Sequence, residues 1–412
     1  MAQLVSAKGS DVLAWRAAGD FAATYRQIIL DRMEFLRSDE ADAMISGAIH
    51  ALEDMAAAND TFCSRCDSLI EEVALCHEPV RLRELATVFY AGLYDHCAIH
   101  HSAPAFYQFS ILFLQALSGA ICRHAYAALR PSSTRMPEFA LIALGPAGRQ
   151  EFSPFCPLQF MLVHDEQNGD AQDGLIQRFA DSVHEGFREC GFQVDELVTP
   201  RNSSWRGTFS EWEQRLDKVL KRGTFSEVIE ILRLTDQTQL DGAGETGSLF
   251  RQMSLAKLAA STVAVNNLVS RVVALSNGIG MMGGLRFQKS GPFRGQFALL
   301  ENALQPLSAS VSALGLLKRV ETMTTPRRVR DILWRRELNV DMAERLLQSW
   351  HALHELRLTR EREVHPDWGN AAPLHLDIEE MTTAEQESLR ESLEAIGNIQ
   401  RHVGLNFSGV GE

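Results

Sequence analysis

The sequence predicts an α+β protein in which a small mixed sheet with flanking helices lies between an N-terminal helical region and a C-terminal helical bundle. Two short apolar runs, Phe139–Leu144 and Leu158–Val163, are typical of buried strands. On both sides of these runs, apolar residues recur at every third or fourth position, which is typical of helices that bury one face. A chain of 412 residues is long enough for two or three domains. We expect a helical region at 1–85, a sheet domain with a leading helix at 86–244 and a helical domain at 245–412.

Helices are expected through most of the first 130 residues. Apolar spacing predicts them at Tyr25–Leu36 and Ile45–Met55, and Asn59-Asp60-Thr61 offers a cap for another. A further helix, Ala105–Leu129, leads to the first strand. It overlaps Ser102–Cys122, a stretch without Asp, Glu, Lys or Arg, but the polar residues within that stretch favour a buried helix over a membrane span.

Further elements are expected after the two strands. The sheet domain should continue with a helix at Leu175–Cys190, a strand at Phe192–Val194 and a helix capped by Ser210. The glycine-rich segment Asn277–Gly295 predicts a loop. Two apolar stripes, Met342–Leu353 and Leu389–Val403, then predict long helices. A capping box formed by Thr382 and Glu385 should open the second of these helices.

Composition excludes several classes of function. A net charge of −13 and a pI of about 5.5 argue against general nucleic-acid binding, which depends on neutralising phosphates. Seven cysteines, without a basic and apolar leader at the start of the chain, indicate reduced thiols. We therefore expect a cytoplasmic protein without a membrane span. One basic run, Lys318–Arg336, is expected to be a solvated helix surface, with a surface that binds an anion or a partner as the alternative.

The most informative motif lies between Phe139 and Val163. The first apolar run ends at Gly145, and Gly148-Arg149-Gln150-Glu151 is expected to turn into a short helix before the second run returns as a neighbouring strand. This layout resembles nucleotidyltransferases of the protein-PII uridylyltransferase type, and in particular bacterial relatives that are often fused to CBS or cyclic-nucleotide-binding domains. The motif of that family reads Gly-Ser-x-Gly-Arg-x-Glu, followed after a few residues by Asp-x-Asp. The resemblance implies a nucleotide-binding site at Gly145, Pro146, Gly148, Arg149 and Glu151.

Three departures from the motif bear on its chemistry. Pro157 and Gln159 stand where the family has two aspartates, which would reach the same metal ions from one strand face. Pro157 offers no ligand, and Gln159 offers only a neutral carbonyl where Mg²⁺ prefers carboxylates. Pro146 replaces the motif serine and has neither a hydroxyl nor a backbone N–H. We therefore expect no metal site, no cofactor and no complete set of catalytic residues; an active enzyme would need Mg²⁺ and a nucleoside triphosphate.

The resemblance extends beyond the first motif. Asp236 matches the third acid of the family, with an ordinary aspartate in a surface loop as the alternative. Gln296–Phe407 is similar to the helical module thought to bind substrate, although Ala298 and Leu300 stand where that module has Asp-x-Lys. The spacing of three further acids does not predict that they share a ligand: Asp165, Glu166 and Asp195.

Clusters of cysteine and histidine have simpler explanations than metal binding. Cys63, Cys66, Cys76 and His77 fall on one predicted helix and its end, where buried thiols are favoured over a zinc site. No group of histidines has the spacing of a helical metal motif, so roles facing a partner or capping a helix are expected for His96, His100, His101, His351 and His354.

Three functions remain open on these grounds. The leading hypothesis is a bacterial regulatory protein with a degenerate nucleotidyltransferase core, which binds a protein partner and retains weak affinity for nucleotide. The second is an active enzyme that transfers a nucleotide to a protein hydroxyl, with Mg²⁺ held by Asp236, Glu151 and another acid. The third is a helical interaction protein in which the sheet is only a scaffold. The sequence does not predict the oligomeric state.

Overall fold

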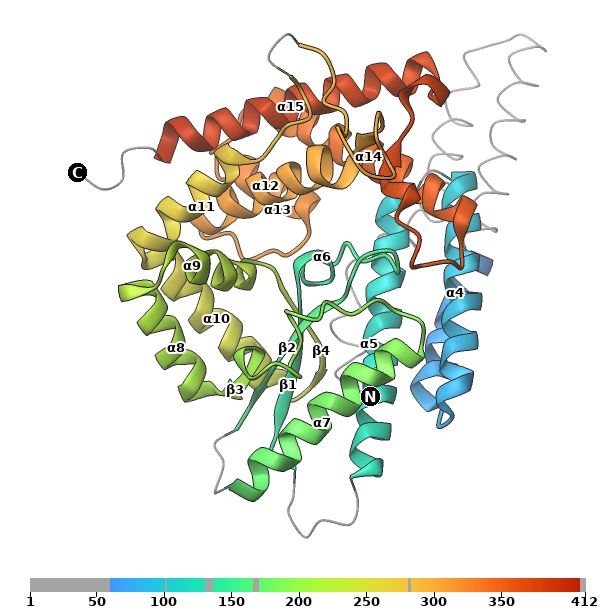
Figure 1. The fold of residues 1–412 in the computed structure, drawn as a ribbon, viewed down its shortest axis with the longest axis vertical. Helices are drawn as coiled ribbons and strands as arrows, with labels where there is room; N and C mark the ends of the chain where they lie inside the picture. The colour runs from blue at the N-terminus through green and yellow to red at the C-terminus, as the bar shows by residue number, and fades with distance from the viewer. Residues whose placement is uncertain (1–59, 101, 130–135, 166–169, 281–282, 408–412) are drawn as a thin grey trace, which may run out of the picture. The chain divides into compact units, whose positions relative to one another are not determined.

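The computed structural model describes residues 60–100, 102–129, 136–165, 170–280 and 283–407 (Figure 1). Glu72–Glu412 forms one compact unit, and Met1–Glu71 is assigned to another. Residues 60–75 are helical, and Asn59 of the predicted cap lies outside the described residues. The helices predicted at Tyr25–Leu36 and Ile45–Met55 lie outside the described residues.

A four-stranded sheet in the order β3-β2-β1-β4 forms the centre of the described unit. β1 (Phe139–Leu144) pairs antiparallel with β2 (Gln159–His164) on one side and with β4 (Gln237–Gly242) on the other. β3 (Arg206–Thr208) runs parallel to β2. The two strands predicted from apolar runs are confirmed, whereas β3 is only three residues long and carries no periodic signal.

The register of the sheet places three separate chain segments at one edge. Leu144, the last residue of β1, lies opposite Gln159 on one side and Gln237 on the other. The turn after β1, the start of β2 and Asp236, which directly precedes β4, therefore meet at the same end of the sheet.

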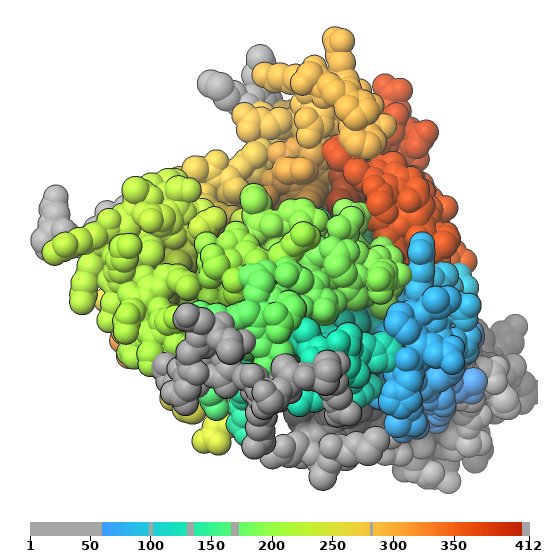
Figure 2. Space-filling view, turned by 60° about the horizontal axis from the view of Figure 1, so that its bottom comes forward, coloured from blue at the N-terminus to red at the C-terminus, as the bar shows by residue number. Residues whose placement is uncertain are grey.

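Helices cover both faces of the sheet. α5 (Ala103–Ala128) packs against α7 (Asp170–Glu189) and β4, while α10 (Gly244–Ala260) packs against β1 and β4 (Figure 1). α7 and the segment that follows it occupy the middle of the face shown in Figure 2, with α8 and α9 in yellow-green to one side. The remaining helices of this part are α4 (Pro79–His100), α6 (Gly145–Gly148), α8 (Phe209–Arg222), α9 (Phe225–Ile231), η1 (Ser203–Trp205) and η2 (Leu232–Thr235).

α5 is long and apolar enough to cross a membrane by length and composition alone. In the structure, 72% of its most apolar window is buried inside the protein. This burial agrees with the prediction of a core helix, because a buried helix can be apolar on all sides.

The C-terminal helices lie beyond the end of the sheet that carries α6 (Figure 1). Both predicted apolar stripes are confirmed: Leu346, Trp350 and Leu353 are buried, as are the stripe residues from Leu389 to Val403. The glycine-rich loop leads to the short pair of β5 (Phe297–Ala298) with β6 (His375–Leu376). The helices of this part are α11 (Thr262–Ala274), the π-helix η3 (Leu300–Leu304), α12 (Gln305–Leu317), α13 (Thr325–Trp334), α14 (Val340–Val364), η4 (Ala372–Leu374), η5 (Ile378–Glu380) and α15 (Thr383–Phe407).

Helix capping confirms one prediction and corrects another. The Thr382 hydroxyl accepts from the Glu385 amide, and the Glu385 carboxylate accepts from the Thr382 amide. Ser210, in contrast, does not cap its helix: Thr208 does, because Glu211 stands three residues after it and completes a capping box.

Two predicted elements are wrong. The short helix is α6, which ends at Gly148 instead of starting there, because the chain already turns at Gly145 with Pro146 in the first turn. The strand predicted at Phe192–Val194 is reduced to a single bridge between Val194 and Leu158.

Candidate functional site

A cavity of about 350 Å³ lies where the edge of the sheet meets the C-terminal helices. It brings together segments from α6, β2, η2, α11, η3, α12 and α14. Most of the residues predicted from the motif line it: Gly145, Pro146, Arg149, Glu151, Pro157, Gln159 and Asp236. Gly148 does not line it. The proximity of these residues agrees with the motif, while their role in binding nucleotide stays a prediction.

The two motif glycines are required by close approaches of the chain. Gly145 has a φ of +58°, and a Cβ there would lie 2.8 Å from Oε1 of Gln159. A Cβ at Gly148 would lie 2.2 Å from the carbonyl oxygen of Asp236. Gly148 therefore allows the turn after β1 to pass directly against the start of β4.

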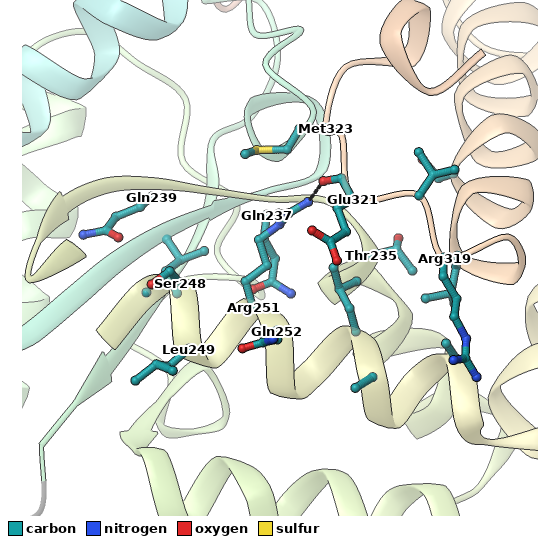
Figure 3. A pocket seen from close by; sticks show the side chains of 18 of the residues that line it. Thr235, Gln237, Gln239, Ser248, Leu249, Arg251, Gln252, Arg319, Glu321 and Met323 are labelled. Carbon is teal, nitrogen blue, oxygen red and sulfur yellow. Dashed lines mark hydrogen bonds between the residues drawn. The ribbon is translucent and has the colours of Figure 1, made fainter. Parts of the chain in front are cut away.

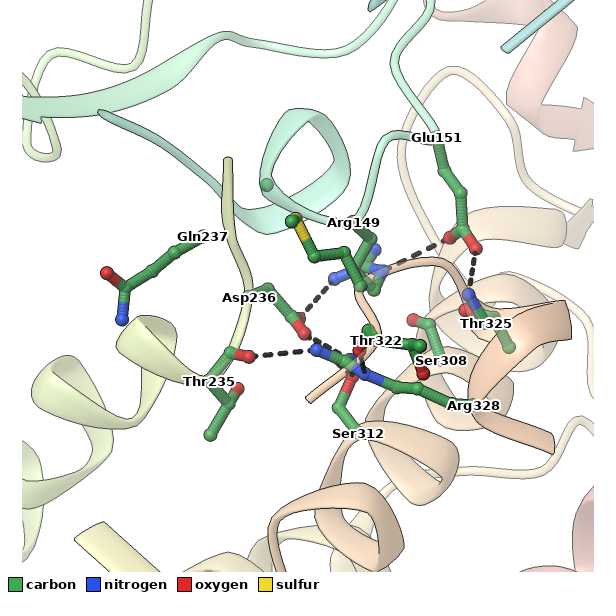
Figure 4. Close-up of polar contacts among 12 residues, drawn as sticks. Arg149, Glu151, Thr235, Asp236, Gln237, Ser308, Ser312, Thr322, Thr325 and Arg328 are labelled. Carbon is green, nitrogen blue, oxygen red and sulfur yellow. Dashed lines mark hydrogen bonds and ion pairs between the residues drawn. The ribbon is translucent and has the colours of Figure 1, made fainter. Parts of the chain in front are cut away.

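Asp236 is buried between two arginines (Figure 4). Its Oδ2 accepts from Arg149 at 2.8 Å, and its Oδ1 accepts from Arg328 at 2.5 Å and from Ser312 at 2.9 Å. Burial acts to raise the pKa of Asp236, but the two guanidinium groups outweigh it and hold the pKa below its ordinary value. The retained acid of the motif is thus an anchor between the sheet and the helices, and the alternative of a surface loop is wrong.

Glu151 also links the sheet domain to the C-terminal helices through hydrogen bonds that it accepts. Its Oε1 accepts from the backbone N–H of Thr325 and from Nε1 of Trp350, each at 3.0 Å. Its Oε2 accepts from Arg149 at 3.1 Å. Glu151 therefore joins the turn after α6 to α13 and α14.

Pro157 and Gln159 face the cavity from the start of β2, since Leu158 and Phe160 between and after them are buried in the core. The Gln159 side chain accepts from Arg233 at 3.1 Å and donates to Asp195 at 2.7 Å. Asp195 also accepts from two backbone N–H groups of its own loop. Sequence spacing did not predict that Asp195 lies here.

The residues present do not fit Mg²⁺, the cation that the resemblance implies. Magnesium prefers oxygen ligands, chiefly carboxylates, in a nearly octahedral arrangement. Both oxygens of Asp236 accept from guanidinium groups, the Gln159 carbonyl accepts from Arg233, and Pro157 has no donor atom. No group of three His, Cys, Asp or Glu side chains with metal-binding geometry occurs among the described residues.

Two arginines of the cavity lack partners for some or all of their donors. Arg233 has a buried Nε without a hydrogen-bond partner in the described structure. Arg271 of α11 makes no side-chain hydrogen bond or ion pair to any described residue. Burial and then Arg233 lower the pKa of Arg271 from its ordinary value, which indicates two like charges near each other. The cavity therefore has spare capacity for an anion.

A second buried network supports the far wall of the cavity. Arg357 of α14 pairs with Glu361 at 2.6 Å, and Glu361 also accepts from Ser153 and Tyr94. Beside it, the Tyr107 hydroxyl lies 2.6 Å from Nδ1 of His354, which contradicts the predicted cap or partner-facing role of this histidine.

Two further expectations concern residues outside the motif. Arg328 is buried, so the prediction that Lys318–Arg336 is a solvated surface is wrong at this position, although Arg330, Arg335 and Arg336 are exposed. Cys63 and Cys66 are buried, as predicted, whereas Cys76 is only half-buried.

Comparison with family models adds two matches. Residues 106–226 match the family described as "Putative nucleotidyltransferase DUF294", and residues 262–407 match the "Putative nucleotidyltransferase substrate binding domain" of the same family. The matches fall inside the predicted domains at 86–244 and 245–412, whose boundaries remain predictions. No curated protein matches the chain. The sheet edge, the motif at Gly145–Glu151 and the two matches agree: this chain belongs to the DUF294 nucleotidyltransferase-like family and carries its C-terminal substrate-binding domain.

Proposed function

We propose that this protein binds the phosphate groups of a nucleotide in the arginine-lined cavity without a divalent cation, does not transfer the nucleotide, and acts as a regulatory protein in a bacterial cytoplasm. The observation that carries the proposal is that Nε of Arg233 and the guanidinium group of Arg271 have no acceptor among the described residues, in a cavity where each carboxylate already accepts hydrogen bonds.

The distribution of charge supports an anionic ligand. Four arginines and three acids line the cavity. Arg149 is neutralised by Asp236 and Glu151, and Arg357 by Glu361. Asp195 is held by Gln159 and backbone N–H groups. Counted with Arg328 and Glu361, five arginines face four acids, so Asp195 balances only one of Arg233 and Arg271, and one positive charge remains. Guanidinium groups bind phosphate oxygens through paired hydrogen bonds.

His354 does not add to the positive charge at neutral pH. Burial, and then Arg357, Arg149 and His351, hold its pKa well below the ordinary value. The affinity of the cavity for an anion is thus attributed to the arginines, whose charge does not change with pH in the accessible range.

Calorimetry with ATP and UTP tests the proposal. The wild-type protein should bind one of them with the same affinity in Mg²⁺ and in EDTA. Arg271→Gln should weaken binding by about ten- to a hundredfold, the loss expected for a charge-assisted hydrogen bond. Arg330→Gln, at an exposed arginine of α13, should leave the affinity unchanged. Binding that requires Mg²⁺, or that survives Arg271→Gln, would contradict the proposal.

The alternative of an active enzyme makes a different prediction. A protein-PII uridylyltransferase-like activity requires a cation held near Gln159, where the oxygens of Gln159 and Asp236 already accept from arginines and Oδ2 of Asp195 accepts from Gln159. Transfer of label from α-³²P-UTP or α-³²P-ATP to any protein, dependent on Mg²⁺, would establish the enzyme in place of the regulator. A third outcome, no nucleotide binding at all, would favour the role of helical scaffold.

A further inference from the structure

A second and larger cavity, of about 770 Å³, lies between β4, α10 and the segment that follows α12 (Figure 3). It is separate from the cavity at the motif but shares Thr235 and Ser312 with it. Asp236 lines the first cavity and Arg328 lines the second, so their ion pair lies in the wall between the two. None of the motif residues at Gly145–Glu151 lines the second cavity.

This second cavity contains a buried hydrogen-bond acceptor without a donor. Gln237 is 1% exposed and lies on the same face of β4 as Gln239. Its Nε2 donates to the carbonyl of Leu234 and to the hydroxyl of Ser254. These two bonds fix the orientation of the amide and leave Oε1 without a partner in the described structure. An unpaired buried acceptor costs about 1–3 kcal/mol, which a ligand that donates to it would recover.

A buried donor lies close to this acceptor. Arg251 of α10 donates through Nη2 to the carbonyl of Glu321, while its Nε has no partner among the described residues. The Ser254 hydroxyl that accepts from Gln237 donates to the backbone carbonyl of Arg251 at 3.1 Å, and the side chains of Gln237 and Arg251 both line this cavity. Figure 3 shows Arg251 reaching from α10 to the segment at Glu321.

The rest of the lining combines apolar and uncharged polar side chains with a positive balance of charge. Three arginines face one glutamate: Arg251, Arg319 and Arg328 against Glu321. Arg328 is already paired with Asp236, whereas burial and then Arg328 lower the pKa of Arg251 from its ordinary value. The apolar lining comes from Ile142, Leu249, Leu255, Ala259, Leu316, Val320 and Met323.

We propose that this cavity is a binding site for a small organic anion that combines an apolar body with one N–H or O–H donor. The anionic group accepts from Arg251, the donor satisfies Oε1 of Gln237, and the body packs against the leucines and Met323. The volume suits a ligand of drug or metabolite size, since such sites range over about 300–1,000 Å³.

The probe 8-anilinonaphthalene-1-sulfonate has these three features: a sulfonate, an N–H group and an apolar body. Calorimetry with the full chain should show saturable binding of one probe per protein. Arg251→Met should weaken it at least about tenfold through loss of a charge-assisted hydrogen bond. Ala259→Phe, which fills the cavity from α10, should weaken it to the same extent without removing any charge.

Two controls separate this site from other surfaces. Ala260→Phe places the same ring on the neighbouring exposed position of α10 and should leave the affinity unchanged. Arg271→Gln, which changes the other cavity, should also leave the affinity for the probe unchanged. Failure of this inference is therefore distinguishable from failure of the proposed nucleotide site. Absence of saturable binding, or an affinity within about threefold of wild type in either Arg251→Met or Ala259→Phe, would overturn the proposal.

Discussion

Asp236 holds two buried guanidinium groups in place, and its replacement tests whether it is a structural anchor. Asp236→Asn would leave Arg149 and Arg328 without their shared counter-charge. Breaking a buried pair in this way typically costs about 3–5 kcal/mol, because a buried charge is left uncompensated. Urea unfolding at pH 7 measures the loss. Asp217→Asn, which removes the exposed partner of Lys257, should change the free energy of unfolding little. Equal effects of the two substitutions would contradict the structural role of Asp236.

His354 should make stability dependent on pH below neutrality. Its pKa is held well below the ordinary value in the folded protein, chiefly by burial, so the unfolded chain binds a proton at higher pH than the folded one. The free energy of unfolding should therefore fall as the pH drops below about 6.5, by up to about 1.4 kcal/mol per pH unit from this residue. Urea titrations between pH 5 and pH 7.5 measure the slope. His354→Gln should flatten it, and an unchanged slope in the variant would refute the assignment.

At the scale of single elements, the turn after β1 depends on Gly148. A Cβ at this position would lie 2.2 Å from a backbone carbonyl that cannot move without shifting β4. Gly148→Ala should therefore destabilise the protein by about 1–3 kcal/mol, the usual cost of overpacking. Gly244→Ala is the matched control, because nothing lies within 4 Å of that position at the start of α10. It should be neutral or stabilising, since alanine is the better helix former. Thermal or urea unfolding of both variants distinguishes a tight contact from a general effect of adding a methyl group.

Local sequence patterns predicted the elements with strong periodicity. They failed where contacts with distant segments determine whether a strand forms or a residue is buried. The strands at Phe139–Leu144 and Leu158–Val163 and the capping box at Thr382 required only local information. The strand predicted at Phe192–Val194 did not form, because only Val194 reaches a partner, at the bridge to Leu158. For Arg328, a local signal existed: it shares a helix face with Thr325 and Ile332, three residues before it and four after it, and both are buried. The prediction treated the basic run as a single surface because of its charge, and so it did not separate Arg328 from the exposed arginines.

At the scale of the whole molecule, the sequence motif located the edge of the sheet at which the cavity forms, but not what surrounds it. The register of β1 with β2 and β4 explains why Gly145, Gln159 and Asp236 meet. Arg233 lies three residues before Asp236, but Asp195 and Arg271 come from two other segments. Asp195 reaches the cavity beside Gln159, and Arg271 reaches it through the packing of α11. No spacing within the sequence relates Asp195 and Arg271 to the motif, so the sequence predicted the loss of metal ligands, through Pro157 and Gln159, but not the arginines that line the cavity.

A crystal structure with ATP and Mn²⁺, in which anomalous scattering locates the cation, tests the central claim most directly. The account predicts phosphate oxygens on Arg233 and Arg271 and no manganese peak beside Gln159, with Asp236 still paired to Arg149 and Arg328. An ordered manganese ion coordinated by Asp236 or Asp195 and by the nucleotide phosphates would contradict it.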